Sequence, residues 1–215
     1  MTPADWAAVA LSVRIALAST ALALVPALVV ARWLARSRYT ATAVVEVAVM
    51  LPLALPPVVT GFALLLVLPR TLAFTWVAAV LASAIVGFPL LVQTARAGFE
   101  AVDPALEDLA LTDGATRWQA FVRVVLPLAG PAVAAGAALH FARGLGEFGA
   151  TIVVAGNIPG QTQTLPLALY ARLHEVGGEA ASVRLALAAV GLTVVSLAVH
   201  RWLLSRLTSR AGRGL

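Results

Sequence analysis

The amino-acid sequence predicts an all-α, multi-pass membrane protein with about five membrane-spanning helices. Hydrophobic residues make up 61% of its 215 residues, charged residues make up 12%, and the mean hydropathy is +0.95. A soluble domain carries about twice that fraction of charged residues, so much of this surface must meet lipid. Five largely uncharged windows approach the length of about 20 residues that a spanning helix needs. We expect a single transmembrane domain over residues 1–215.

The expected spans follow the uncharged windows in chain order. The first window is short, and Arg14 at its edge extends the span by reaching toward the membrane surface. Three prolines, Pro52, Pro56 and Pro57, should make the second span irregular. The five spans are expected at Leu11–Trp33, Val44–Leu68, Thr71–Gln93, Val122–Phe141 and Val183–Trp202.

The uncharged segment Phe148–Ala171 is the part of the chain that leaves the number of spans open. Its middle, GNIPGQTQT, is polar and rich in turn-forming residues. A sixth full span is possible, but it would need a seventh to keep the arginine distribution described next. We therefore expect the outer end of the fourth span, a loop, and a short helix at Thr162–His174.

The basic residues predict the orientation of the chain in the membrane. All fifteen are arginines, and ten of them fall in the segments 32–38, 96–123 and 201–213. Because cytoplasmic loops of membrane proteins carry an excess of basic residues, these segments and the C-terminus should be cytoplasmic and the N-terminus outside. Arginines spread in this way argue against nucleic-acid binding. The absence of Cys excludes disulfides and thiolate metal sites, and three scattered His residues make any other metal site improbable.

The connection at about residues 96–127 is unusually long and charged for this chain. Asp103 and Pro104 suit a helix start, and a short helix should run to about Thr112. Gly114 should take a left-handed conformation that ends this helix, and a second helix should begin near Thr116. The result is a helix–glycine–helix elbow, which on physical grounds could equally rest on the bilayer or dock onto a partner.

The spacing within the elbow resembles the EAA loop of ATP-binding-cassette importer permeases. Asp108 takes the acidic position, Gly114 the glycine and Leu126-Pro127 the ending, while Leu109 departs from the usual alanine. The resemblance implies a type I importer permease fold, whose elbow is a coupling helix seated in a cleft of a cytoplasmic ATPase. The residues implied in coupling are Glu107, Asp108, Leu109, Ala110, Gly114, Ala115, Trp118 and Pro127. No phosphate-binding loop G-x-x-x-x-G-K-[ST] occurs, so we expect no cofactor here and ATP bound by the partner.

A second stretch narrows the resemblance. The segment FARGLGEFGATIVVAGNIPGQTQTLPLALY, residues 141–170, is similar to oxyanion importer permeases and most closely to the molybdate permeases. Sulfate/thiosulfate permeases share a related element, and tungstate permeases are close. The resemblance implies a homodimer in the inner (cytoplasmic) membrane, two ATPase subunits and an extracytoplasmic binding protein.

Four polar residues near the outer end of the fourth span are candidates for the translocation path or outer gate. His140, Arg143 and Glu147 have the spacing i, i+3, i+7 of one helix face, and Asn157 follows in the GNIPG loop. The alternative, slightly favoured, is that Arg143 and Glu147 form an ion pair at the membrane edge. The GNIPG loop could touch the binding protein or simply be a turn.

Two other classes of protein are weaker alternatives. A secondary transporter or channel acting alone would usually show internal symmetry, which is not evident here. A membrane-embedded enzyme would need a cluster of catalytic residues, and the sequence contains no paired intramembrane acids or serine–base arrangement.

Overall fold

The structure is a computed structural model that describes residues 1–37 and 41–211. Arg38 and Arg213, two of the arginines used to predict orientation, lie outside these ranges. Within them, every regular element is a helix. The elements are α1 (Pro3–Arg36), α2 (Ala41–Ala54), α3 (Pro57–Val67), α4 (Trp76–Glu100), α5 (Pro104–Thr112), α6 (Arg117–Ala120), the π-helix η1 (Phe121–Val125), α7 (Leu126–Leu145), α8 (Gly149–Val154), α9 (Leu165–Leu173) and α10 (Glu179–Ala211).

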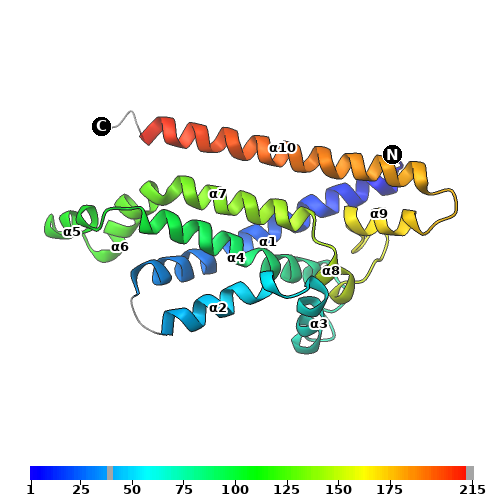
Figure 1. Cartoon of the computed structure of the whole chain (residues 1–215), viewed down its shortest axis with the longest axis horizontal. Helices are drawn as coiled ribbons and strands as arrows, with labels where there is room; N and C mark the ends of the chain where they lie inside the picture. Colours follow the sequence, from blue (N-terminus) through cyan, green and yellow to red (C-terminus); the bar gives the residue numbers. More distant parts are fainter. Residues whose placement is uncertain (38–40, 212–215) are drawn as a thin grey trace.

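The long helices form a bundle with α1, α4 and α7 at its centre. Helix α2 packs on α4, and α10 packs on α7 and α9. Much of the buried core consists of alanine, which lets helix backbones approach closely. Figure 1 shows the elbow α5–α6 and the last turns of α10 at one end of the bundle, and the N-terminus with α8 and α9 at the other.

Among the residues that the structure describes, four helices are long and apolar enough to cross a membrane, and the bent pair α2–α3 brings the number to as many as five. The predicted spans one, three, four and five each correspond to one long helix. The third begins five residues later than predicted, at Trp76, because the Thr75 side chain accepts a hydrogen bond from the Ala78 amide and caps the helix.

The predicted second span is not one continuous helix. The chain bends by 110° between helices α2 and α3. Figure 1 shows the two helices running in different directions. Pro56 and Pro57 lie at this break; neither has an amide hydrogen to continue the α2 ladder, and Pro57 instead opens α3. The irregularity predicted from the prolines is therefore confirmed, and the predicted span Val44–Leu68 consists of two helices.

The outer end of the fourth span also differs from the prediction. Helix α7 ends at Leu145, and the chain turns at Gly146 and Glu147 before α8 begins. Residues 149–154 are thus a separate short helix packed against α3, not an extension of α7. The predicted short helix at Thr162–His174 is confirmed as α9, which is three residues shorter at its start and one at its end.

Close packing of α4 on α7 depends on a glycine and gives a first testable prediction. A Cβ added at Gly98 would lie 2.4 Å from the Ala132 Cβ, a distance that forces the helices apart. Overpacking of this kind costs about 1–3 kcal/mol. We expect Gly98→Ala to lower the thermal unfolding midpoint in detergent, and Ala132→Gly in the same chain to restore most of it. A double variant no more stable than Gly98→Ala alone would contradict this packing.

Candidate functional site

The first half of the elbow is built as the sequence predicts. The Asp103 carboxylate accepts a hydrogen bond from the Ala105 amide at 2.9 Å, and Pro104 occupies the first turn of α5. Gly114 has a φ of +89°, the left-handed conformation expected at the end of this helix. The Gly114 amide donates to the Leu111 carbonyl at 3.1 Å, which closes the end of α5.

The second half of the elbow starts at a capping box. The Thr116 hydroxyl accepts from the Gln119 amide at 3.2 Å, and the Gln119 side chain accepts from the Thr116 amide at 2.9 Å. Trp118 follows; its ring lies 5.8 Å from that of Phe121, yet the residue remains 71% exposed. Two short helices of fixed direction therefore flank the Gly114 turn.

Glu107 turns inward, away from the exposed side of α5. The residue is only 7% exposed, and one carboxylate oxygen lies 2.5 Å from Arg32 Nη2 and also pairs with Arg36. Both arginines belong to the last turns of α1, 75 and 71 positions earlier in the sequence. We call Glu107, Arg32 and Arg36 the Glu107 ion cluster.

Two aromatic rings complete the surroundings of this cluster. The Arg32 guanidinium lies 5.9 Å from the ring centroid of Phe99 and 5.8 Å from that of Phe121. These contacts join the end of α1 to the end of α4, to η1 and to α5. Since cations are attracted to aromatic faces, each contact adds to the ion pairs. The buried Glu107 carboxylate consequently attaches the elbow to α1, and Arg32 connects this contact to α4 and η1.

The side of α5 away from Glu107 is exposed to solvent, and from there Asp108 also attracts the Arg36 guanidinium. Asp108 and Leu109 are exposed, Leu109 by 59%. Ala110, Gly114 and Ala115 line a shallow cavity of about 370 Å³ at the joint between the two elbow helices. The predicted coupling residues thus divide into Glu107, which faces α1, and a group including Asp108 and Leu109 that presents a surface to solvent; their contact with an ATPase stays a prediction.

Pro127 explains the π-helix that joins the elbow to α7. Proline has no amide hydrogen for the carbonyl of Arg123 four residues earlier, and its ring crowds that carbonyl. The backbone widens, and the Leu126 amide donates instead to the Phe121 carbonyl five residues back. Such single-turn π segments often occur at functional sites. Here the π-helix forms the joint between the elbow and α7.

The predicted face of His140, Arg143 and Glu147 does not form, while a role of these residues and Asn157 in the translocation path stays a prediction. His140 is fully buried; one ring nitrogen lies 3.0 Å from the Thr20 hydroxyl and the other 3.3 Å from the Ala84 carbonyl oxygen, so the ring packs between α1 and α4. Glu147 lies beyond the end of α7, which corrects the predicted i, i+3, i+7 face. The predicted Arg143–Glu147 ion pair is confirmed at 2.7 Å. The Asn157 side chain accepts a hydrogen bond from Gln163 within its own loop.

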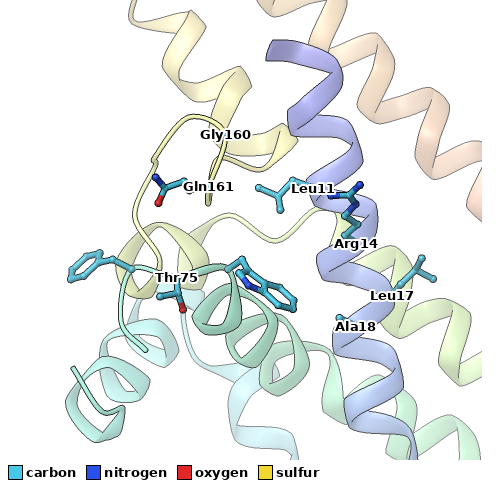
Figure 2. A pocket seen from close by; sticks show the side chains of 9 residues that line it. Leu11, Arg14, Leu17, Ala18, Thr75, Gly160 and Gln161 are labelled. Atoms are coloured by element: carbon cyan, nitrogen blue, oxygen red, sulfur yellow. The ribbon is translucent and has the colours of Figure 1, made fainter. Parts of the chain in front are cut away.

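A cavity of about 830 Å³ opens instead between α1 and the loops at the end of the bundle opposite the elbow. Figure 2 shows Leu11 and Arg14 on α1 facing the loop that carries Gly160 and Gln161. Arg14 is the one charged residue among the described residues that line it, and the polar side chains of Thr75 and Gln161 line it as well. Sequence reasoning treated Arg14 only as a residue at the membrane edge; its isolation between apolar windows was the available signal.

Sequence reasoning also missed the role of Arg32 and Arg36, which it used only as markers of orientation. Their spacing of four residues places both side chains on one side of α1, which is the pattern expected of two cations that share one acidic partner. The sequence offered no way to tell which of several acids that partner is.

Comparison with known proteins shows where this fold occurs. Residues 24–209 match the family model for the inner membrane component of binding-protein-dependent transport systems. The chain belongs to this family. Its permease relatives include the molybdenum transport system permease protein ModB of Escherichia coli K12, 39% identical over 99% of both chains, and that of Haemophilus influenzae, 40% identical over 98% of both. The sulfate transport system permease protein CysT of Escherichia coli K12 is 37% identical over 84% of this chain and 68% of its own length.

Two solved transporters share the fold of this inner membrane component. A chain of an amino acid ABC transporter crystallised with histidines superposes with a TM-score of 0.69 at 18% identity, covering 95% of this chain and 94% of the other. A chain of the MetNI methionine ABC transporter in an inward-facing conformation gives a TM-score of 0.68 at 14% identity, covering 96% and 99%. The type I importer permease fold predicted from the elbow is therefore confirmed, and the chain is a multi-pass inner-membrane protein.

Proposed function

We propose that this permease is the transmembrane subunit of an ATP-driven importer that carries molybdate into the cell. The observation that carries the proposal is the near full-length similarity to molybdenum transport permeases, which includes the GEFGAT and GNIPG segments at the outer end of the bundle. Sulfate/thiosulfate is the second candidate, because a sulfate permease also matches this chain, but over a smaller share of its own length. Tungstate is a further candidate that rests on the resemblance of the sequence alone.

The proposed assembly contains two copies of this chain, two cytoplasmic ATPase subunits and an extracytoplasmic binding protein. In this assembly the N-terminus lies outside, and the elbow and the C-terminus lie in the cytoplasm. The position of the elbow supports this orientation. The elbow lies at the end of α1 that carries Arg32 and Arg36 (Figure 1), and basic residues at the end of a spanning helix favour the cytoplasmic side.

The proposed mechanism follows from the two sides of α5. The ATPase binds the exposed side, which includes Asp108 and Leu109, and its closure on ATP displaces the elbow. The Glu107 ion cluster passes this displacement to the inner end of α1, while the π-helix before Pro127 lets α7 change its angle. The ATPase can drive this change only if it binds the elbow differently in its two nucleotide states.

Uptake by reconstituted vesicles tests the substrate. The permease is reconstituted with its ATPase and binding protein, and accumulation of labelled molybdate is measured with ATP and excess unlabelled oxyanion. We expect ATP-dependent uptake that unlabelled molybdate competes away and excess sulfate does not. Preferential inhibition by sulfate would overturn the choice of molybdate, and equal uptake without the ATPase would indicate a transporter that acts alone.

A further inference from the structure

A cavity of about 620 Å³ lies between the inner end of α1 and the elbow. Its walls are mainly apolar and come from α1, α6, η1 and the start of α7. Three arginines, Arg32, Arg36 and Arg117, are among its lining residues, together with Glu107 from α5. The lining residues are Val25, Leu28, Val29, Arg32, Trp33, Arg36, Glu107, Arg117, Trp118, Phe121 and Leu126.

The charges at this cavity do not balance. Arg32 and Arg36 share the single carboxylate of Glu107, and the exposed Asp108 also attracts Arg36. Arg117 is exposed, has no ion-pair partner among the described residues, and lies near enough to Arg36 to repel it. Three cations against two carboxylates leave net positive charge at the mouth of an apolar cavity.

The position of the cavity along α1 matches the boundary of the hydrocarbon layer. Eighteen residues separate Arg14 from Arg32, which at a helical rise of about 1.5 Å per residue is about 27 Å, close to the thickness of the hydrocarbon core. The arginines therefore lie at headgroup depth, and Val25 and Val29 extend toward the acyl chains. Trp33 and Trp118 are exposed beside the cavity, as indole rings commonly are at membrane interfaces.

We propose that this cavity binds one anionic phospholipid of the adjacent leaflet, which is the cytoplasmic leaflet if the proposed orientation holds. Its phosphate lies between Arg36 and Arg117, and an acyl chain follows Val25 and Val29. Basic pockets between spanning helices on the cytoplasmic side are suited to anionic headgroups. The lipid joins the end of α1 to α6, so it stiffens the elbow and makes coupling depend on the anionic lipid content of the membrane.

Native mass spectrometry of the purified full chain in detergent tests the proposal without ATPase or molybdate, so its outcome is independent of the transport assay. Phosphatidylglycerol and phosphatidylcholine of equal chain length are the probes. We expect preferential retention of phosphatidylglycerol by the wild type, and a loss of about fivefold in that preference for Arg117→Gln. Arg123→Gln, which removes an exposed arginine outside the cavity, is the matched control and should bind like the wild type.

A second variant keeps the charges and fills the cavity. Val29→Trp should lower retention of both lipids while the protein elutes as a monodisperse species. Three results would overturn the proposal: equal retention of the two lipids by the wild type, the same loss for Arg117→Gln and Arg123→Gln, or displacement of the lipid by millimolar inorganic phosphate, which would indicate a site for a free anion.

Discussion

Replacing Glu107 with alanine is expected to lower ATP-driven molybdate uptake at least about tenfold while the chain still inserts into the membrane. The substitution leaves Arg32, whose side chain is only 20% exposed, without its carboxylate partner between Phe99 and Phe121. Removing one partner of a buried ion pair typically costs about 3–5 kcal/mol. The elbow should then separate from α1, because this cluster provides the charged contacts between them.

A comparison of ATP hydrolysis with transport distinguishes a role in coupling from a general loss of stability. We expect the assembled Glu107→Ala transporter to hydrolyse ATP but to take up little molybdate. A misfolded permease would instead fail to bind its ATPase, so that ATP hydrolysis and uptake would both be lost. Glu107→Gln, which keeps the shape and hydrogen-bonding oxygen, should be intermediate. Asp108→Ala removes an equal charge one residue away and should leave the α1–elbow contact intact in a disulfide-crosslinking assay. Wild-type uptake by Glu107→Ala at normal abundance would refute the role given to the cluster.

The second large effect is expected at Gly114. Proline fixes φ near −65°, whereas the turn has a φ of +89°, and it removes the amide that donates to the Leu111 carbonyl. Gly114→Pro should therefore misdirect the two elbow helices and lower recovery of the ATPase in a pull-down by about tenfold or more. Nothing lies within 4 Å of a Cβ added there, so the effect arises from the backbone and not from a steric clash.

Gly160 supplies the matched control for this experiment. It also has a positive φ, +75°, and open space around it, but it lies in the loop at the other end of the bundle. Gly160→Pro should strain that loop equally and leave ATPase recovery at the wild-type level. Equal recovery by the wild type and by Gly114→Pro would show that the shape of the elbow does not matter for docking.

Local signals in the sequence were enough to predict the elbow. A cap at Asp103, a glycine at position 114 and a helix start near Thr116 depend on a few neighbouring residues, and each is present in the structure. The membrane-spanning helices could be predicted equally well, because long uncharged windows are typical of membrane spans. The break between α2 and α3 was only half predicted, because prolines reveal where a helix ends and not the angle at which the next one leaves.

Contacts between distant residues could not be predicted in the same way. Glu107 pairs with arginines more than seventy positions away, and its neighbour Asp108 was an equally good candidate until the direction of α5 was known. His140 is a second residue whose contacts with distant residues could not be predicted. A histidine in a span suggested a polar path, but its two nitrogens are hydrogen-bonded within the helix packing.

Labelling of a single cysteine tests the central claim, that the exposed side of α5 is a cytoplasmic surface for the ATPase. The chain contains no cysteine, so Leu109→Cys introduces a unique thiol at an exposed position, and Ile158→Cys provides one at the opposite end. With a membrane-impermeant maleimide, we predict that Leu109→Cys reacts only in inverted vesicles and is protected when the ATPase is added, while Ile158→Cys reacts only in intact spheroplasts. Reaction of Leu109→Cys in intact spheroplasts, or no protection by the ATPase in inverted vesicles, would contradict the account.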